Sequence, residues 1–291
     1  MSLTTEQTVI TEPGVYTIPE DVYHRDPVPG GSLSFSGAKR LLAPSCPAKF
    51  RYERDNGRPE KRTFDFGHAA HSAVLGVGAP VVVVDADSWR TDAAKNQRKA
   101  AYAEGKVPLL AEEAARVEGM AQALRQHEIA SALFNPEHGA PEQSLFRVDP
   151  ETGVWLRSRF DWLPHPTPSG RLIVGDYKST ISAEPAAIAK SAANYAYHQQ
   201  AAWYADMALA LGLSDDVSFV FVFQEKTPPY LVTPVELDDE ALRIGRLRNR
   251  EAIDLYAECV RTDTWPGYTD GIELISLPFW ATSDYDLDLV I

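Results

Sequence analysis

The chain has 291 residues, a hydrophobic content of 44% and a formal net charge of −13. This length suits one large or two small domains, and the hydrophobic content excludes a disordered chain. The acidic total argues against a protein that coats nucleic acid through a uniformly basic surface.

Targeting and redox features favour a cytoplasmic protein with no membrane partner. No apolar run approaches the roughly 18 residues that a membrane-spanning helix needs, and the N-terminal sequence lacks the pattern of a secretory signal. The two cysteines, Cys46 and Cys259, are far apart, so we expect no disulfide framework. Two cysteines also cannot supply the four thiolates of an iron–sulfur cluster.

The predicted elements begin with an arm and a helical region. Residues 1–30 are rich in Pro, Gly and Thr, which predicts an N-terminal loop or arm. Ser34 or Ser36 is a candidate N-cap for a first helix, and Pro47 comes just before a second. In a third segment, residues recur at helical spacing. These features predict helices at 37–42, 48–54 and 63–75.

The rest of the chain is predicted to contain both helices and strands. Three long runs predict helices, at 110–133, 185–211 and 237–260. β-branched, alternating or apolar runs predict strands, at 81–84, 143–148, 154–163, 171–178, 217–224 and 230–235. The tail from Thr262 is predicted to be an ordered loop. Since no repeat or linker is visible, residues 31–291 are interpreted as a single α/β domain.

Basic residues are concentrated in two segments of this acidic chain. Residues 39–62 contain eight basic and three acidic residues. A second cluster comprises Arg243, Arg246, Arg248 and Arg250. Such runs are either solvated helix faces or patches that contact phosphates. On the second interpretation, the first segment would follow the backbone of DNA with little sequence preference.

Two carboxylates and a lysine lie near the ends of predicted strands. Asp176 and Lys178 close an apolar strand, and they point the same way because alternate side chains of a strand share a face. Asp161 lies on the polar face of the preceding strand, beside two arginines. A salt-bridged acid and a surface ion pair are the simpler alternatives. Two carboxylates that hold a divalent cation, with a lysine that orients or deprotonates water, are the minimum for metal-dependent phosphodiester hydrolysis.

Two predicted helices add candidate residues. His68 and His71 are one turn apart, but they lack the intervening Glu of a zincin motif, and a helical histidine is more often structural. Gln200 and Tyr204 are also one turn apart. They either donate hydrogen bonds to phosphate oxygens or belong to an ordinary amphipathic helix.

Taken in order, these segments resemble the PD-(D/E)XK nuclease superfamily, within it the RecB-like nucleases and most closely the RecE-type exonucleases. The segments that carry the resemblance are 33–42, 67–71, 159–162, 176–180 and 200–204. The resemblance runs from about residue 22 to the end of the chain, and it departs from the family at Phe160, where the family has Pro. It implies a restriction-endonuclease-like α/β core, with a mixed central sheet flanked by helices and an N-terminal helical decoration.

The resemblance also implies a metal site. Asp161 and Asp176 would be metal ligands, together with the backbone carbonyl of Tyr177. His71 would bind or orient near the metal, and Glu142, just before a predicted strand, could join the site. One or two Mg²⁺ or Mn²⁺ ions would be the cofactor, since hard oxygen ligands favour them.

Catalytic and DNA-binding roles are implied as well. Lys178 would position or activate the attacking water, while Gln200 and Tyr204 would support the site or contact the phosphate. The expected DNA-binding residues are Ser34, Ser36, Lys39, Arg40, Lys49, Arg51, Arg54, Arg58 and Arg159.

The activity implied by the resemblance is that of an exodeoxyribonuclease that degrades linear double-stranded DNA from its 5′ ends in phage-type recombination. Such enzymes form homo-oligomers and work with a single-strand annealing protein. The alternatives are a RecB-like nuclease of other polarity or endonuclease action, a non-catalytic DNA-binding module and a zinc hydrolase. The intact set of Asp161, Asp176 and Lys178 argues against the module, and the zinc hydrolase lacks a third ligand beside His68 and His71.

Overall fold

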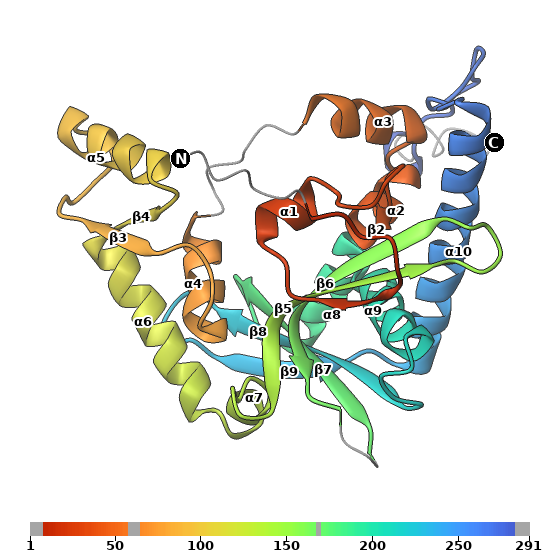
Figure 1. The fold of residues 1–291 in the computed structure, drawn as a ribbon. Helices are drawn as coiled ribbons and strands as arrows, with labels where there is room; N and C mark the ends of the chain where they lie inside the picture. The colour runs from red at the N-terminus through yellow and green to blue at the C-terminus, as the bar shows by residue number, and fades with distance from the viewer. Residues whose placement is uncertain (1–7, 58–64, 167–169, 283–291) are drawn as a thin grey trace, which may run out of the picture.

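The central element of the molecule is a mixed β-sheet. The computed structural model describes residues 8–57, 65–166 and 170–282. The strands of the main sheet are β1 (Gly14–Tyr16), β2 (Leu33–Ser34), β5 (Gly139–Val148), β6 (Trp155–Pro164), β7 (Leu172–Thr180), β8 (Val217–Glu225) and β9 (Val232–Glu236). Within the described residues these seven strands have the order β1-β5-β6-β7-β8-β9, with β2 beside β6 (Figure 1). β7 and β8 are parallel, as are β2 and β6, and the other pairs are antiparallel.

Helices cover both faces of this sheet (Figure 1). The helices are α1 (Glu20–His24), α2 (Phe35–Leu41), α3 (Pro47–Asn56), α4 (Asp65–Leu75), α5 (Asp92–Ala103), α6 (Ala111–Gln126), α7 (Glu128–Leu133), α8 (Pro185–Tyr195), α9 (Tyr197–Ala210), α10 (Asp239–Thr262) and α11 (Phe279–Thr282). A small parallel pair, β3 (Val81–Val84) and β4 (Val107–Leu110), lies beside α4 and α6.

The alternation of side chains on β8 separates two hydrophobic cores. Phe221 and Phe223 pack in the core that includes residues of α2, α9 and α10. Val222 points to the other face and packs with residues of α4, α6 and α7. The result is a sheet between two helical layers, which confirms the predicted α/β class with a central sheet flanked by helices.

Two helices predicted as continuous are each divided in the structure. The run 110–133 breaks at His127, whose extended backbone and side chain cap the helix α7. The run 185–211 breaks at Ala196, which has a left-handed φ of 57°. Neither break has a Gly or Pro, so helix propensity gave no sign of them.

The N-terminal segment contains regular structure where the sequence predicts a loop. β1 pairs with β5 in the main sheet, and α1 follows it. Ile10, Ile18 and Tyr23 are buried in a cluster with Phe146 of β5. These apolar residues are too widely spaced to show a strand or helix period, and tertiary packing orders them. α5 and β4 also form where no element was predicted.

The long helix α10 closes one face of the molecule. Asp238 caps it by accepting a hydrogen bond from the backbone N–H of Ala241 (2.8 Å). Gly245 lets it approach α9 closely, because a Cβ there would lie 2.2 Å from the carbonyl oxygen of His198. Among the described residues, no helix has the length and apolar character needed to cross a membrane, α10 included.

Candidate functional site

A cavity of about 870 Å³ lies beside the carboxyl end of β7. It is lined by residues of the N-terminal segment, α4, β5, β6, β7 and α9. Six of the lining residues were predicted from the sequence as metal or catalytic residues: His71, Glu142, Asp161, Tyr177, Lys178 and Tyr204. The structure therefore brings together side chains from five separate elements.

Glu142 and Asp161 occupy opposite positions on neighbouring strands. The antiparallel register of β5 and β6, with Gln143 opposite Phe160, places Glu142 opposite Asp161. Like charges at opposite positions destabilise a sheet. Glu142 also has a φ of 56°, in the left-handed region that costs a non-glycine residue about 1–3 kcal/mol. Both features lower the stability of the folded protein, and such a cost is typical of a site that binds a cation.

His71 lies between these two carboxylates. Its Nε2 is 3.1 Å from Asp161 Oδ2, and its Nδ1 is 3.6 Å from Glu142 Oε1. Burial alone would lower the pKa of His71, but the carboxylates of Asp161 and Glu142 outweigh burial and raise it to about 8. In the metal-free protein at neutral pH, the imidazolium thus supplies the positive charge that the two carboxylates require.

Asp161 is held by the backbone of the next strand as well as by His71. The N–H of Tyr177 donates a hydrogen bond to Asp161 Oδ2 (3.0 Å). Burial would raise the pKa of Asp161, but His71 and Lys178 outweigh burial and lower it, so the group is ionised at neutral pH. The neighbouring arginines have other partners.

Those partners exclude the simpler alternative for Asp161, a salt bridge to one of its neighbouring arginines. Arg157 pairs with Asp26 of the N-terminal segment, and Arg159 pairs with Glu142. Neither arginine forms an ion pair with Asp161 among the described contacts. The physical reason is the strand pairing. Ser144 lies opposite Arg159, so Glu142, two residues before Ser144 on β5, lies diagonally across from Arg159 and within its reach.

Asp176, Lys178 and Gln200 form a second, more buried group. Lys178 Nζ lies 2.5 Å from Asp176 Oδ2, and the amide of Gln200 donates to Asp176 Oδ1 (2.8 Å). Asp176 is only 2% exposed, which rules out a surface ion pair. Burial, together with the charge of Asp161, raises the pKa of Asp176 to about 6. Burial would lower the pKa of Lys178, but the two aspartates raise it, so the ammonium stays charged.

Gln200 and Tyr204 support this group from α9. The buried amide of Gln200 donates its hydrogen bond to Asp176, so Gln200 fixes the position of that carboxylate. The ring of Tyr204 packs 4.8 Å from that of Phe160 and lines the cavity. The proposed contact between Tyr204 and a phosphate, like the metal ligation by the carbonyl of Tyr177, stays a prediction.

The donors fit a divalent cation. One ligand atom each from His71, Glu142 and Asp161 lie within 4.8 Å of one another, the one such group of three found in the described part of the chain. The carboxylates of Glu142 and Asp161 are hard oxygen donors of the kind that hold a divalent cation. His68 lines the cavity but is not part of this group, so among the described residues the zinc site predicted on both His68 and His71 is not formed.

The basic segment mostly forms contacts within the protein. The side chain of Lys39 donates to a backbone carbonyl (2.8 Å), Arg40 pairs with Glu53 (2.7 Å) and Arg51 with Asp55 (2.5 Å). Lys49 and Arg54 donate to tyrosine hydroxyls. Arg58 lies outside the described residues, while Ser34 and Ser36 line the cavity. DNA contact by these residues stays a prediction.

Six polar residues that were not predicted as site residues also line the cavity: Glu20, Tyr23, His24, Ser72, Ser179 and Lys226. Glu20 and His24 pair with each other on α1 at 3.5 Å, within the segment predicted as a loop. Lys226 directly follows the apolar strand β8, and Lys178 lies near the end of the apolar strand β7. A lysine at the carboxyl end of an apolar strand was therefore the signal that could have identified Lys226.

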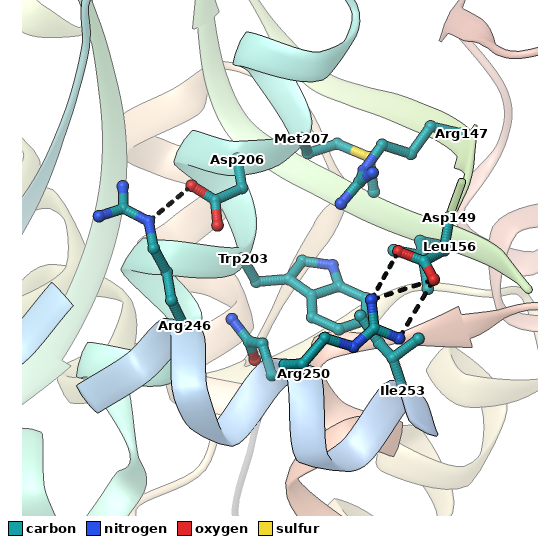
Figure 2. Close-up of a pocket in the computed structure, with 10 residues that line it drawn as sticks. Arg147, Asp149, Leu156, Trp203, Asp206, Met207, Arg246, Arg250 and Ile253 are labelled. Atoms are coloured by element: carbon teal, nitrogen blue, oxygen red, sulfur yellow. Dashed lines mark hydrogen bonds and ion pairs between the residues drawn. The ribbon is translucent and has the colours of Figure 1, made fainter. Parts of the chain in front are cut away.

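A second, smaller pocket of about 200 Å³ shares no lining residue with this cavity (Figure 2). In it, Arg246 of α10 pairs with Asp206 (2.9 Å) and Arg250 pairs with Asp149 (3.0 Å). Asp149 also accepts hydrogen bonds from the backbone and hydroxyl of Thr152. These contacts hold the turn between β5 and β6 against α10. We therefore assign this pocket a structural role.

An Asp149→Ala variant is expected to lower the free energy of unfolding by about 2–4 kcal/mol, because it leaves the hydrogen bonds of Arg250 unmade in a nearly buried place. The side chain of Asp149 is 5% exposed. Asp254, a partner of the same guanidinium at 2.5 Å, is 56% exposed. Asp254→Ala is therefore expected to cost less than about 1 kcal/mol. Urea unfolding followed by circular dichroism compares the two variants, and equal losses would contradict this account.

Comparisons with known proteins bear on the fold and the family. A family model described as a PDDEXK-like domain of unknown function (DUF3799) matches residues 34–278. The crystal structure of a "putative exonuclease" from Eubacterium rectale has a TM-score of 0.58 at 11% identity, over 95% of this chain and 100% of that one. The crystal structure of SSO0001 has a TM-score of 0.29 at 13% identity, over 71% of this chain and 88% of that one. A search of curated proteins found no match. At 11% identity, the similarity to the Eubacterium rectale structure is a similarity of fold alone.

Proposed function

This chain belongs to the family of PDDEXK-like domains of unknown function (DUF3799), and from that premise we propose that it is a metal-dependent deoxyribonuclease. Membership of the PD-(D/E)XK superfamily, predicted from the sequence, is thereby confirmed. The observation that carries the proposed activity is that Glu142, Asp161 and Lys178 line one cavity, with the buried Asp176 paired to Lys178.

The side chains divide the work of hydrolysis between them. A bound Mg²⁺ or Mn²⁺ ion would supply Lewis-acid polarisation of the scissile phosphate. Asp161, Glu142 and Asp176 would hold it, and His71 would give up the proton that it carries in the metal-free protein. Lys178 is charged, so it would donate hydrogen bonds to the attacking water or to a phosphate oxygen rather than accept a proton.

The finer proposal is a 5′-to-3′ exonuclease that acts on linear double-stranded DNA in recombination. It rests on the resemblance of the motifs to the RecE-type exonucleases. The similarity in fold to a protein described as an exonuclease is compatible with it. The same resemblance suggests a homo-oligomer and a single-strand annealing protein as partner, acting in the cytoplasm.

The alternatives within the same fold are other polarity, endonuclease action and DNA binding without catalysis. Asp176 argues against the non-catalytic module. A buried carboxylate whose pKa is raised to about 6 is costly to keep ionised, and a domain that only binds DNA has no need of it.

Metal and substrate requirements test the proposal directly. The protein is incubated with 5′-labelled or 3′-labelled linear duplex and with closed circular DNA, in Mg²⁺, Mn²⁺ or EDTA. We expect linear DNA to be degraded only with metal, with the 5′ label released first, while circles stay intact. Gel electrophoresis of time points gives the result.

Each other outcome selects an alternative. Nicked circles would indicate an endonuclease, and early release of the 3′ label would indicate the opposite polarity. DNA binding without cleavage in any metal would support the non-catalytic module and refute the proposed activity.

A further inference from the structure

Small side chains make up part of the cavity lining. Gly67 and Ser72 belong to α4, Gly78 and Ala79 follow it, and Ser179 belongs to β7. A Cβ on Gly67 would lie 3.8 Å from the hydroxyl of Ser179, and Ser179 directly follows Lys178 of the proposed reaction centre. Small and hydroxylated side chains leave space for a sugar–phosphate backbone and offer hydrogen bonds to its oxygens.

Lys226 lines the same cavity, and the sheet holds its backbone in place. It directly follows β8, and its backbone N–H donates to the carbonyl of Thr180 at the end of β7 (3.1 Å). Because β7 and β8 are parallel, with Thr180 opposite Glu225, Lys178 and Lys226 both lie at the carboxyl ends of strands. Ligands of α/β sheets bind outside this edge.

Lys226 also differs from the other long cations of the cavity in its contacts. Arg159 is paired with Glu142, and Lys178 with Asp176. Across the described segments, no ion pair or side-chain hydrogen bond involves the ammonium of Lys226. Lys226 is partly buried, lines the same cavity as the carboxylates and has no carboxylate partner. Its charge can therefore attract a phosphate of the bound strand.

We propose that Lys226 binds a backbone phosphate of the nucleic-acid strand, next to the phosphate that is hydrolysed. Ser72 and Ser179 line the same cavity as Lys226 and Lys178, and their hydroxyls can donate to oxygens of the strand. This inference rests on the proposed nuclease function and adds a phosphate-binding residue that lies outside the motifs of the sequence. A lysine that contacts phosphate affects binding and its salt dependence, and it leaves the chemical step unchanged.

Steady-state hydrolysis of linear duplex with Mg²⁺, measured at several KCl concentrations, tests this residue. For Lys226→Ala we expect KM to rise about 3- to 10-fold with kcat within about twofold of wild type. The slope of log(1/KM) against log[KCl] should become less steep by about 0.7–0.9, the value for one lost phosphate contact. Lys226→Arg should retain most of the slope.

The matched control is Lys190→Ala, which removes an exposed lysine of α8 that does not line the cavity. It should leave KM and the slope unchanged. If wild type hydrolyses DNA but Lys226→Ala keeps its KM and slope, or loses kcat alone, the phosphate contact is refuted and the nuclease function stands. If wild type hydrolyses no DNA in any metal, the proposed function fails and this inference fails with it.

Discussion

A Lys178→Ala variant is expected to lose metal-dependent hydrolysis of linear DNA by roughly 10²–10³-fold. The change removes the charged donor for the water or phosphate, and it also affects Asp176. Lys178 is the close counter-charge of that buried carboxylate, at 2.5 Å. Without it, the pKa of Asp176 rises above its present value of about 6, and the group takes up a proton at neutral pH. A protonated Asp176 is a poor metal ligand, so Mn²⁺ affinity measured by calorimetry should fall as well.

Folding has to be separated from chemistry in this experiment. Lys178→Met keeps most of the aliphatic volume and should show the same loss of activity, with a far-UV circular dichroism spectrum like that of wild type. Lys99→Ala, an exposed lysine of α5, should retain full activity. Full hydrolysis by Lys178→Met would refute the assignment of this active site.

The sequence identified the parts of the site that lie on regular strands. Alternation along β6 predicted the face of Asp161, and the apolar run of β7 predicted the buried end that carries Asp176 and Lys178. These predictions succeed because a strand has a fixed period and a buried strand has a distinctive composition. The fold class followed from the same runs.

Long-range pairing accounts for what the sequence did not predict. The partner of Arg159 is set by the register of β5 and β6, which no local pattern encodes. Glu142 was included through the resemblance alone, and its left-handed backbone is visible only in the structure. β1 has three residues and is held by its pairing with β5, so it is too short to show a period. The place of Lys226 in the cavity likewise depends on the parallel pairing of β7 and β8.

The second large effect is expected for Asp161→Asn. Asparagine can still accept the hydrogen bond from the N–H of Tyr177, so the local fold should persist. The negative charge is lost, and with it the largest influence that raises the pKa of His71, so the imidazole becomes neutral near pH 7. We expect hydrolysis to fall on the order of 10³–10⁴-fold. We expect Mn²⁺ affinity to fall about 100-fold. Calorimetry and the linear-duplex assay measure both quantities, and wild-type Mn²⁺ affinity in this variant would exclude Asp161 as a ligand.

Glu142→Gln is the matched change on the opposite strand, and the comparison distinguishes two arrangements of the metal. If Asp161 and Asp176 hold the ion without Glu142, the loss of the Glu142 charge acts at a distance. If Glu142 holds the ion together with the two aspartates, both variants lose a direct ligand. The strained backbone of Glu142 and its position opposite Asp161 favour the second arrangement. We therefore expect Glu142→Gln to weaken Mn²⁺ binding at least about tenfold. An unchanged affinity would mean that Asp161 and Asp176 hold the ion without Glu142.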